Sequence, residues 1–589
     1  MPVRILGRCA VSLSFALVLV MGLVVIAGRT SALQLEATVG APSRLQAGTD
    51  WTVGGPCGST IQACIDSPLV VNGDRILIPA GHYTESLLLN KAVALIGDGR
   101  QTTVIHAVAN DRVMTISGNA ITSTVVVSGL TVTGGYLTGF PCPGACGAGI
   151  LVTGTLQLFV QNCVITNNAV DFQGGGLYVA TNVPITLSNV DVVSNTSNIG
   201  PGSGVYSLGP VTVINGRFEG NGRGSALVVN GALTISGTAF MNNTSGGGVR
   251  ATGAVTVTGS RFERNHNDTS EYHGGGGLYV TGTLMLSDTT FVSNTAKTGG
   301  GGLAVRGSAT IHGSRFEQNV SDYIGGALLH THGPLSIQGT EFVSNVSEFY
   351  GGAVRAEAPL TVTSGTFENN WLGKTYGFGY GGAIWAHDSL TISGTQFISN
   401  AAPDAGGGIV HTSIFEGPVG DGRVVNALFA RNRTGNRGSA MVLSSGGNVV
   451  VLHATLVDSG LNPGQAIVVT TGTVGITDTI ITSHTVGISR TSGTVYADYN
   501  LFYGNTVNKA GAIGGGTHDQ GGDPRFSDPA ADDYHLAAGS AAIDKGIDAG
   551  VTTDIDGESR PYGIGFDIGA DEYAGPIVFI YLPLVLKNR

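Results

Sequence analysis

A short motif, Phe-x-x-Asn, recurs along most of this chain of 589 residues. It begins at Phe218, Phe240, Phe262, Phe291, Phe316, Phe342, Phe367, Phe397, Phe429 and Phe502, and the same unit with valine begins at Val164 and Val192. From Phe218 to Phe429 the steps measure 22 to 32 residues, and a Gly-Gly pair lies in most intervals. A period of this size is typical of stacked supersecondary units, so the sequence predicts a solenoid.

Each period is expected to form one coil of a parallel β-helix. Between Gly299 and Asn319, three short alternating stretches are separated by Gly, Ser and Thr, and no segment of helical period interrupts them. Coils stack ~4.8 Å apart, so each Phe should lie on the next Phe. Each Asn should bond the same amide one coil away, as in the Asn ladders of stacked strands. We therefore predict an all-β fold of about 14 coils, each with three short strands.

Aromatic residues gather on one expected outer face. The residue after the first inward position of each coil should point outward, because side chains alternate along a strand. These positions include Tyr178, Tyr206, Arg250, Tyr279 and Trp385, and the turns before the Gly pairs add Tyr323, Tyr350, Trp371 and Tyr380. Exposed rings beside hydrogen-bonding groups suit a polysaccharide, so we interpret the nine residues as candidate binding residues. The alternative is that the rings only stack on one another and stabilise the coils.

Three parts of the sequence carry a family resemblance. The Gly381-Gly382-Ala383-Ile384 and Phe397-x-x-Asn400 units resemble the repeats of bacterial polymorphic outer-membrane proteins. The segment from Thr60 to Gly97 resembles the start of pectin-lyase-like β-helices, which implies a right-handed spiral with an N-terminal cap. The series from Asp523 to Tyr573, including Asp567-Ile568-Gly569-Ala570-Asp571-Glu572-Tyr573, resembles the choice-of-anchor Q domain. That resemblance implies a C-terminal cap that closes the last coil and precedes a surface-attachment tail.

The domain boundaries follow from these patterns. Residues 1–32 combine Arg4 and Arg8, an apolar run and Thr30-Ser31-Ala32, which predicts a secretory signal; an uncleaved anchor is the alternative. A spacer (33–50), the β-helix (51–505), the cap (506–574) and an apolar tail (575–589) follow. The tail is either a strand packed on the cap or an attachment signal. Membrane contact is expected only through the N-terminal anchor or this tail.

Charge and cysteine content indicate an extracellular protein. The formal net charge of −11 offers no basic surface for phosphates, so we expect no nucleic-acid partner. In an oxidising compartment, Cys57 and Cys64 are expected to pair in the N-terminal cap. Two of Cys142, Cys146 and Cys163 should also pair, with Cys142 and Cys146 preferred, although sequence alone does not fix the connectivity.

No catalytic motif stands out in the coils. The weak candidates are Arg355, Glu357 and His387, which are expected on adjacent coils of the outer face. Asp554 and Asp556 resemble part of a calcium loop, but the full ligand series is missing, and turn capping with an Arg560 ion pair is the competing interpretation. We therefore expect no cofactor, with calcium as the alternative.

The predicted function is non-catalytic: a secreted or surface-attached protein that adheres to polysaccharide or other cell-surface material. The alternative is a carbohydrate-active enzyme, either a polysaccharide lyase or a glycoside hydrolase, acting on the same face of the β-helix. A purely structural role is the third hypothesis.

Overall fold

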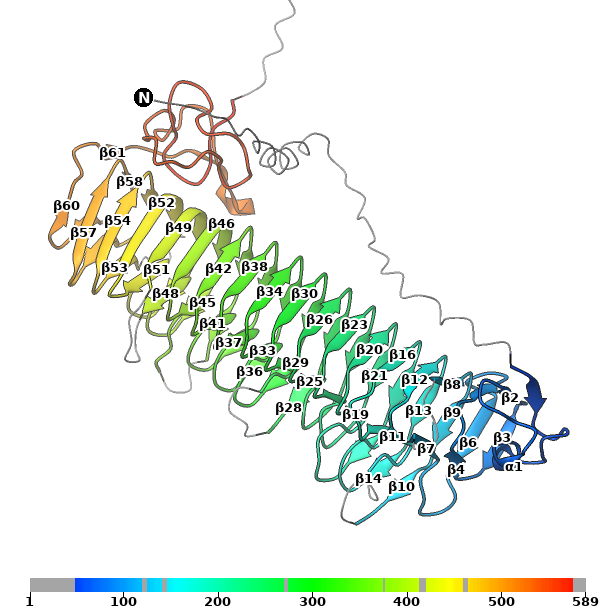
Figure 1. The fold of residues 1–589 in the computed structure, drawn as a ribbon. Coiled ribbons are helices and arrows are strands. Elements are labelled where there is room, and N and C mark those ends of the chain that lie inside the picture. Colours follow the sequence, from blue (N-terminus) through cyan, green and yellow to red (C-terminus); the bar gives the residue numbers. More distant parts are fainter. Residues whose placement is uncertain are drawn as a thin grey trace, which may run out of the picture. The chain divides into compact units, whose positions relative to one another are not determined.

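The strands stack into a single parallel solenoid of about 15 turns, as the period predicts (Figure 1). The computed structural model describes residues 48–118, 124–139, 146–269, 274–373, 377–412, 420–458 and 464–575. Residues 1–47, Cys142 and residues 576–589 lie outside them, and with them the predicted signal and nearly all of the tail. Within the described ranges the helices are α1 (Ile61–Asp66) and the 3-10 turn η1 (Pro529–Ala531). The right-handed sense of the spiral stays a prediction.

Three columns of parallel strands form the coils. The first column contains β4 (Leu87–Leu89), β7 (Met114–Gly118), β11 (Ile150–Gly154), β15 (Leu177–Val179), β19 (Val205–Ser207), β22 (Leu227–Val229), β25 (Val249–Ala251), β29 (Leu278–Val280), β33 (Leu303–Val305), β37 (Leu328–His330), β41 (Val354–Ala356), β45 (Ile384–Ala386), β48 (Ile409–Thr412), β51 (Met441–Ser444), β53 (Gln465–Val469), β56 (Val486–Arg490) and β59 (Val507–Ala510). The second column runs from β1 (Asp50–Thr52), which pairs with β2 (Arg75–Ile78), to β60 (Ile513–Gly514), and the third from β3 (Gly81–Thr84) to β61 (Gln520–Gly521). The coils thus continue to Gly521, beyond the expected boundary at Asn505.

A fourth column of two-residue strands is present in only some of the coils. Its first block contains β10 (Tyr136–Leu137), β14 (Ala169–Val170) and β18 (Thr196–Ser197). Its second block contains β28 (His266–Asn267), β32 (Thr295–Ala296), β36 (Val320–Ser321), β40 (Val346–Ser347), β44 (Trp371–Leu372), β47 (Ala401–Ala402) and β50 (Arg433–Thr434). The sequence does not reveal this column, because two-residue strands are too short to show an alternating pattern.

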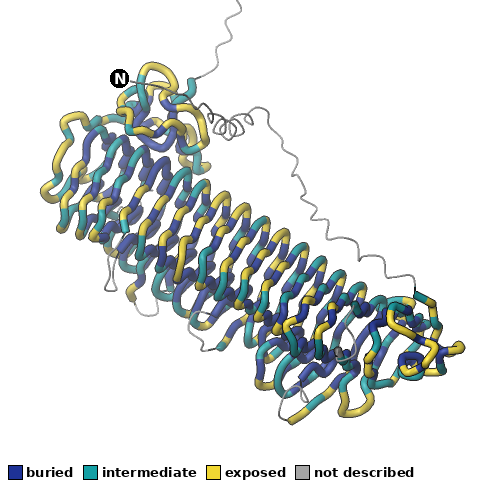
Figure 2. Tube along the Cα trace, in the orientation of Figure 1, coloured by how far each residue is buried: buried dark blue, intermediate teal, exposed yellow. Residues whose placement is uncertain are grey.

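The predicted core stacks are confirmed. From Phe218 to Phe429 the rings form an unbroken pile with centroids 4.6 to 5.0 Å apart. From Asn168 to Asn432 each side-chain amide donates to the amide oxygen of the next coil, at 2.8 to 3.2 Å. Figure 2 shows buried residues in coils along the whole length of the solenoid. Every rung therefore satisfies its buried amide through the neighbouring coil.

One predicted unit is wrong by a single residue. The valine unit was placed at Val164–Asn167, but the inward pair is Ile165 and Asn168. Ile165 pairs with Val192, whereas Asn167 lies in a turn at φ +52°. Since side chains alternate along a strand, only one of two consecutive Asn residues can join the ladder, and a shift of one residue reverses the faces.

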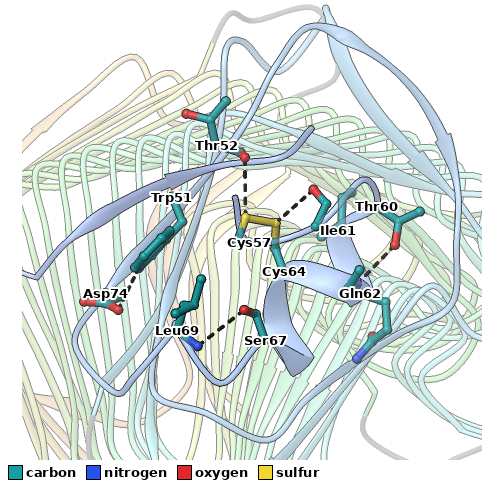
Figure 3. The surroundings of a disulfide bond; sticks show 12 residues. Trp51, Thr52, Cys57, Thr60, Ile61, Gln62, Cys64, Ser67, Leu69 and Asp74 are labelled. Carbon is teal, nitrogen blue, oxygen red and sulfur yellow. Dashed lines mark hydrogen bonds between the residues drawn. A yellow bond between two sulfur atoms is a disulfide. The ribbon is translucent and has the colours of Figure 1, made fainter. Parts of the chain in front are cut away.

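A disulfide closes a short loop near the N-terminal end of the described chain (Figure 3). Cys57 and Cys64 are bonded, and Cys64 lies on α1, whose N-cap Thr60 accepts a hydrogen bond from the backbone N–H of Ala63 at 3.1 Å. Cys146 is also disulfide-bonded, to a partner outside the described residues. Cys163 is a free, buried thiol, and its burial raises its pKa to about 11. No helix within the described ranges is long and apolar enough to cross a bilayer.

The C-terminal segment packs against the side of the coils. Its short hairpin consists of β62 (Phe526–Asp528) and β63 (Asp533–Leu536). The backbone N–H of Ala570 donates to Thr455 Oγ1 at 3.0 Å, and Asn426 Nδ2 donates to the carbonyl of Thr553 at 2.7 Å. The shared apolar cluster contains Ile480, Leu501, Leu536, Ala542 and Ile568. The segment therefore covers side chains of the earlier coils instead of the last strand edge.

Candidate functional site

The predicted outer column has the correct register but is not exposed. Tyr178, Tyr206, Val228, Arg250, Tyr279, Ala304, Leu329, Arg355, Trp385 and Val410 pair from coil to coil in that order. The exposed fractions are 7% for Tyr178, 9% for Tyr206, 7% for Tyr279 and 0% for Trp385, so the predicted exposure of these rings is wrong.

Turns between the coils cover these rings. Ile324, Tyr350 and Tyr380 follow one another in parallel bridges over the first column, and Tyr323 packs beside them. The Tyr178 and Tyr206 rings stack at 5.4 Å within a separate apolar cluster. The outer column is thus a second core beneath the turns. Alternation along the sequence shows on which face of a strand a side chain lies. It does not show whether a turn covers that face.

Trp371 is the one predicted aromatic residue that is well exposed, with 45% of its surface open. It lies on β44 between Val346 of β40 and Ala401 of β47, which are paired with it in the fourth column. These smaller neighbours leave the ring standing above a flat strand face. An exposed indole of this kind is suited to stack on the CH face of a sugar.

A notch opens where the fourth column is interrupted. The coils between Phe218, Phe240 and Phe262 are 22 residues long, whereas the next five steps are 25 to 30 residues long. The described residues of these short coils form only isolated bridges, Thr196 with Gly222 and Gly224 with Ser245, between β18 and β28. The missing strands leave a cavity of about 250 Å³. The short 22-residue steps are the signal in the sequence that could have predicted this site.

Polar groups from four coils line the notch. Its lining residues are Ile199, Gly200, Pro201, Arg223, Gly224, Ser225, Ser245, Gly246, Arg250, Asn267, Thr269 and Tyr279. Two of the nine candidate binding residues, Arg250 and Tyr279, therefore meet here, with the guanidinium carbon of Arg250 5.6 Å from the centroid of the Tyr279 ring. The other seven candidates are not among the lining residues.

Hydrogen bonds hold the walls of the notch in place. Arg223 Nη1 donates to Asn198 Oδ1 at 2.8 Å, which directs this exposed side chain. Asn267 Oδ1 accepts from the backbone N–H and the hydroxyl of Thr269, at 3.1 and 2.7 Å. The described lining contains two guanidinium groups, hydroxyls and amides, but no Asp, Glu or His. This set suits the recognition of hydroxyl and acidic groups, and one of its hydroxyls, Ser245 Oγ, donates to Asp268 Oδ2 at 3.3 Å.

The weak catalytic candidates form a packed ionic cluster. Arg355 is 4% exposed and its guanidinium carbon lies 5.0 and 4.9 Å from the rings of Tyr350 and Trp385. Its Nη2 pairs with Glu357 Oε1 at 2.6 Å, and His387 stacks on the Trp385 ring at 6.0 Å. The guanidinium thus contacts two aromatic rings that also pack on each other with centroids 5.5 Å apart, which is typical of a stabilising cation–π cluster.

A serine, a histidine and an aspartate also meet in the last coils, a set that the sequence analysis missed because its members are far apart in the chain. Ser439 Oγ lies 3.4 Å and Asp458 Oδ2 3.7 Å from His484 Nδ1. A catalytic triad needs the hydroxyl and the carboxylate on opposite ring nitrogens, and here both face the same one. All three side chains are buried, and burial lowers the pKa of His484 to about 4. This set is therefore a buried polar cluster.

The acidic residues of the C-terminal segment have separate roles. Asp554 accepts backbone hydrogen bonds from Asp556, Glu558 and Glu572, at 2.8 to 3.1 Å, so its carboxylate caps turns. Arg560 pairs with Glu572, not with Asp554, at 2.6 Å in a fully buried ion pair. Asp556 instead faces His535, with 2.8 Å between Oδ2 and Nε2. The structure thus does not bring Asp554 and Asp556 together as two open ligands.

Comparisons with known proteins show only distant similarity. No family model matches the chain. A cell surface glycoprotein of Methanothermus fervidus is 28% identical over 113 residues, which cover 19% of this chain and 15% of the relative. The catalytic domain of a GH87 α-1,3-glucanase has a TM-score of 0.27 at 13% identity, covering 67% of this chain and 66% of that one. Pectate lyase Pel9A has a TM-score of 0.18 at 14% identity, covering 89% and 96%.

Proposed function

We propose that the chain is an extracellular glycan-binding solenoid whose ligand occupies the notch of the two short coils. The observation that carries the proposal is the composition of the notch: two arginines, a tyrosine and fixed amide and hydroxyl groups around one cavity of about 250 Å³. Convergent polar groups beside an aromatic ring are the usual make-up of a ligand site.

Trp371 is a second candidate contact in the same column of strands. It lies on β44, four rungs beyond β28, where its register partner is the exposed His266; the notch residue Asn267 points to the opposite, buried face. At ~4.8 Å for each rung the separation along the axis is ~19 Å, about the length of four sugar units. Stacking of a sugar on this indole is therefore proposed as a contact separate from the notch.

The proposed extracellular location is supported by cysteine chemistry. Three of the four described cysteines are in disulfides, which persist in oxidising compartments. The predicted signal at residues 1–32 agrees with this location, and the similarity to a cell surface glycoprotein points the same way. Attachment to a surface through residues 575–589, and the identity of residues 506–574 as a choice-of-anchor Q domain, are part of the proposal.

A glycan array with the purified chain tests the proposal. We expect binding to a subset of polysaccharides, and a loss of at least tenfold in affinity for Arg250→Gln and Arg223→Gln. Arg261→Gln on β27 (Arg261–Glu263) is the matched control, because Arg261 lies on the third column and pairs with Glu263 at 2.7 Å. Tyr206→Leu is the matched control for Tyr279→Leu, since both tyrosines occupy the outer column but only Tyr279 lines the notch.

Two results would contradict the proposal. One is binding that is unchanged in all three notch variants. The other is release of unsaturated or reducing sugars that depends on Arg355 and Glu357, which would favour the alternative of a polysaccharide lyase or glycoside hydrolase.

A further inference from the structure

We propose that His535, Asp556 and Asp571 form a binding site for a divalent transition-metal ion, with Zn²⁺ as the reference ion. Their ligand atoms all lie within 4.8 Å of one another. The three residues come from strand β63, from the turn that follows Asp554 and from the end of the C-terminal segment. An ion at this point would join three stretches that are well separated in the chain. This site is independent of the proposed glycan-binding function.

The histidine lies between two carboxylates, and a metal ion would replace the hydrogen bond that its Nε2 makes to Asp556. Its Nε2 faces Asp556 Oδ2 at 2.8 Å, while its Nδ1 bonds to Asp533 Oδ1 at 2.5 Å on the other side of the ring. Metal-bound histidines typically donate their second N–H to a carboxylate, which fixes the tautomer and the ring orientation. Asp533 would have that role here, outside the three ligands.

The third ligand is a buried carboxylate that faces a cavity. Asp571 is 7% exposed, and one of its oxygens accepts the backbone N–H of Leu536 at 2.6 Å, which orients the group. A cavity of about 40 Å³ is lined by His535, Asp556 and Asp571 together with residues that include Gln396, Leu428 and Thr455 of the coils. A space of this size exceeds the roughly 10–15 Å³ that one water molecule needs, so an ion with a bound water fits.

The donor set selects the kind of ion. One imidazole and two carboxylates suit Zn²⁺ or Mn²⁺, whereas Ca²⁺ prefers six to eight oxygen ligands. Zinc–ligand bonds of about 2.0–2.2 Å place neighbouring donors roughly 3.3 Å apart. His535 and Asp556 are exposed side chains that can adjust to this spacing, while Asp571 stays fixed by Leu536.

A metal would suit the architecture of the segment. Among described residues 522–575, regular structure is limited to β62, β63 and the 3-10 turn η1. The sequence from 506 to 589 contains no cysteine. Loop-rich units commonly depend on disulfides or structural metals, because their apolar cores are small.

Titration of the EDTA-treated, purified chain with ZnCl₂ tests the site. His82 Nδ1 and His106 Nε2 lie 3.4 Å apart and could bind Zn²⁺ as a second pair, so the titration uses a His82→Gln background. In that background we expect one equivalent of Zn²⁺ to bind and to raise the unfolding temperature. His535→Gln and Asp556→Asn should weaken this binding at least tenfold, and Asp533→Asn by about 10–100-fold. Because all three side chains are exposed, these variants are expected to fold.

His518→Gln is the matched control. His518 is also exposed and bonds to a carboxylate, that of Asp498, at 2.9 Å, but it has no second carboxylate ligand beside it in the described part of the chain. Its substitution should leave Zn²⁺ affinity unchanged. Equal Zn²⁺ affinity in the His535→Gln variant would overturn the proposal. So would stabilisation by Ca²⁺ that matches that of Zn²⁺ and survives His535→Gln.

Discussion

At the scale of single residues, the ladder amides explain how a polar side chain is tolerated at every rung of an apolar core. Asn319 Nδ2 donates to Asn345 Oδ1 at 3.0 Å and to the carbonyl of Phe291 at 2.9 Å. Its own Oδ1 accepts from the backbone N–H and the amide of Asn294. Each amide thus has partners on both neighbouring coils, and loss of one leaves two others incomplete.

We therefore expect Asn319→Ala to lower the unfolding free energy by about 2–3 kcal/mol, because buried donors and acceptors lose their partners. Urea unfolding followed by circular dichroism measures the change. Asn436→Ala is the control, since Asn436 is exposed and outside the ladder, and it should change the midpoint little. Equal shifts for the two variants would contradict the ladder's role.

Arg355 belongs to the packing, not to a reaction, in this interpretation. Arg355→Ala should lower the unfolding free energy by about 3 kcal/mol, because it removes the ion-pair partner of Glu357 and the cation that contacts the rings of Tyr350 and Trp385. Thermal unfolding checks this value, with the exposed Arg306→Ala as control. Glycan binding should stay unchanged. A stable Arg355→Ala variant that loses a sugar-cleaving activity would refute the structural role.

A buried histidine links coil stability to pH. Burial lowers the pKa of His330 to about 4, and only Nε2 has a partner, the carbonyl of Gly307 at 3.1 Å. In the unfolded chain the ordinary pKa is about 6.5, so the unfolded state binds the additional proton first. Stability should therefore be fully present above pH 6.5 and fall by up to about 3 kcal/mol as the pH decreases to 4.

The urea midpoint at pH 7 and pH 4.5 measures this loss. His330→Gln should show a smaller difference between the two pH values than the unchanged chain, whereas His332→Gln, at an exposed position, should not. An equal pH dependence in His330→Gln would exclude this histidine as the source.

At the scale of elements, the last coil leaves the edge of its strands unpaired within the described residues. Strands β59, β60 and β61 pair only with the preceding coil. Lys509 closes the core beneath them: its Nζ donates to the carbonyl of Ala497 at 2.8 Å, forms an ion pair with Asp519 and lies 5.6 Å from the Phe502 ring. Inward lysines of this kind discourage edge-to-edge association.

Lys509→Leu should consequently cause concentration-dependent self-association, because an apolar end replaces a charged one. Sedimentation velocity over a range of concentrations detects it. Lys545→Leu, on the exposed surface of the C-terminal segment, is the control. A Lys509→Leu variant that sediments like the control would show that the edge is protected by other means.

At the scale of the whole described chain, the C-terminal segment is a separate layer on the coils. Ile568 is fully buried in the cluster that joins the two. Ile568→Asp should release residues 522–575 while the coils stay folded, because a buried carboxylate without a partner is costly and the rungs bond mainly to each other. Hydrogen exchange should accelerate in 522–575 but not in 200–400. Ile564→Asp, at a position that is 96% exposed, should have no effect.

The sequence predicts the repeating part of this structure well and its irregular parts poorly. The Phe pile, the Asn ladder and the register of the outer column follow from local periodicity, since each rung repeats the same contacts. The burial of Trp385 and the position of the C-terminal segment depend on contacts between distant segments, which no period records. The notch is only partly predictable. The 22-residue spacing of Phe218, Phe240 and Phe262 is visible in the sequence, but the sequence does not show that the missing strands leave a cavity.

The interrupted fourth column also indicates how a notch of this kind could form at another coil. The interruption coincides with the two 22-residue coils, while the pile of rings continues at 4.7 and 5.0 Å from Phe218 to Phe262. Deletion of the fourth-column strand from another coil should therefore open a new notch without disturbing the Phe pile or the Asn ladder. Insertions and deletions of a few residues would then relocate ligand sites along such a scaffold, and selection has a simple means to change specificity while foldability is preserved.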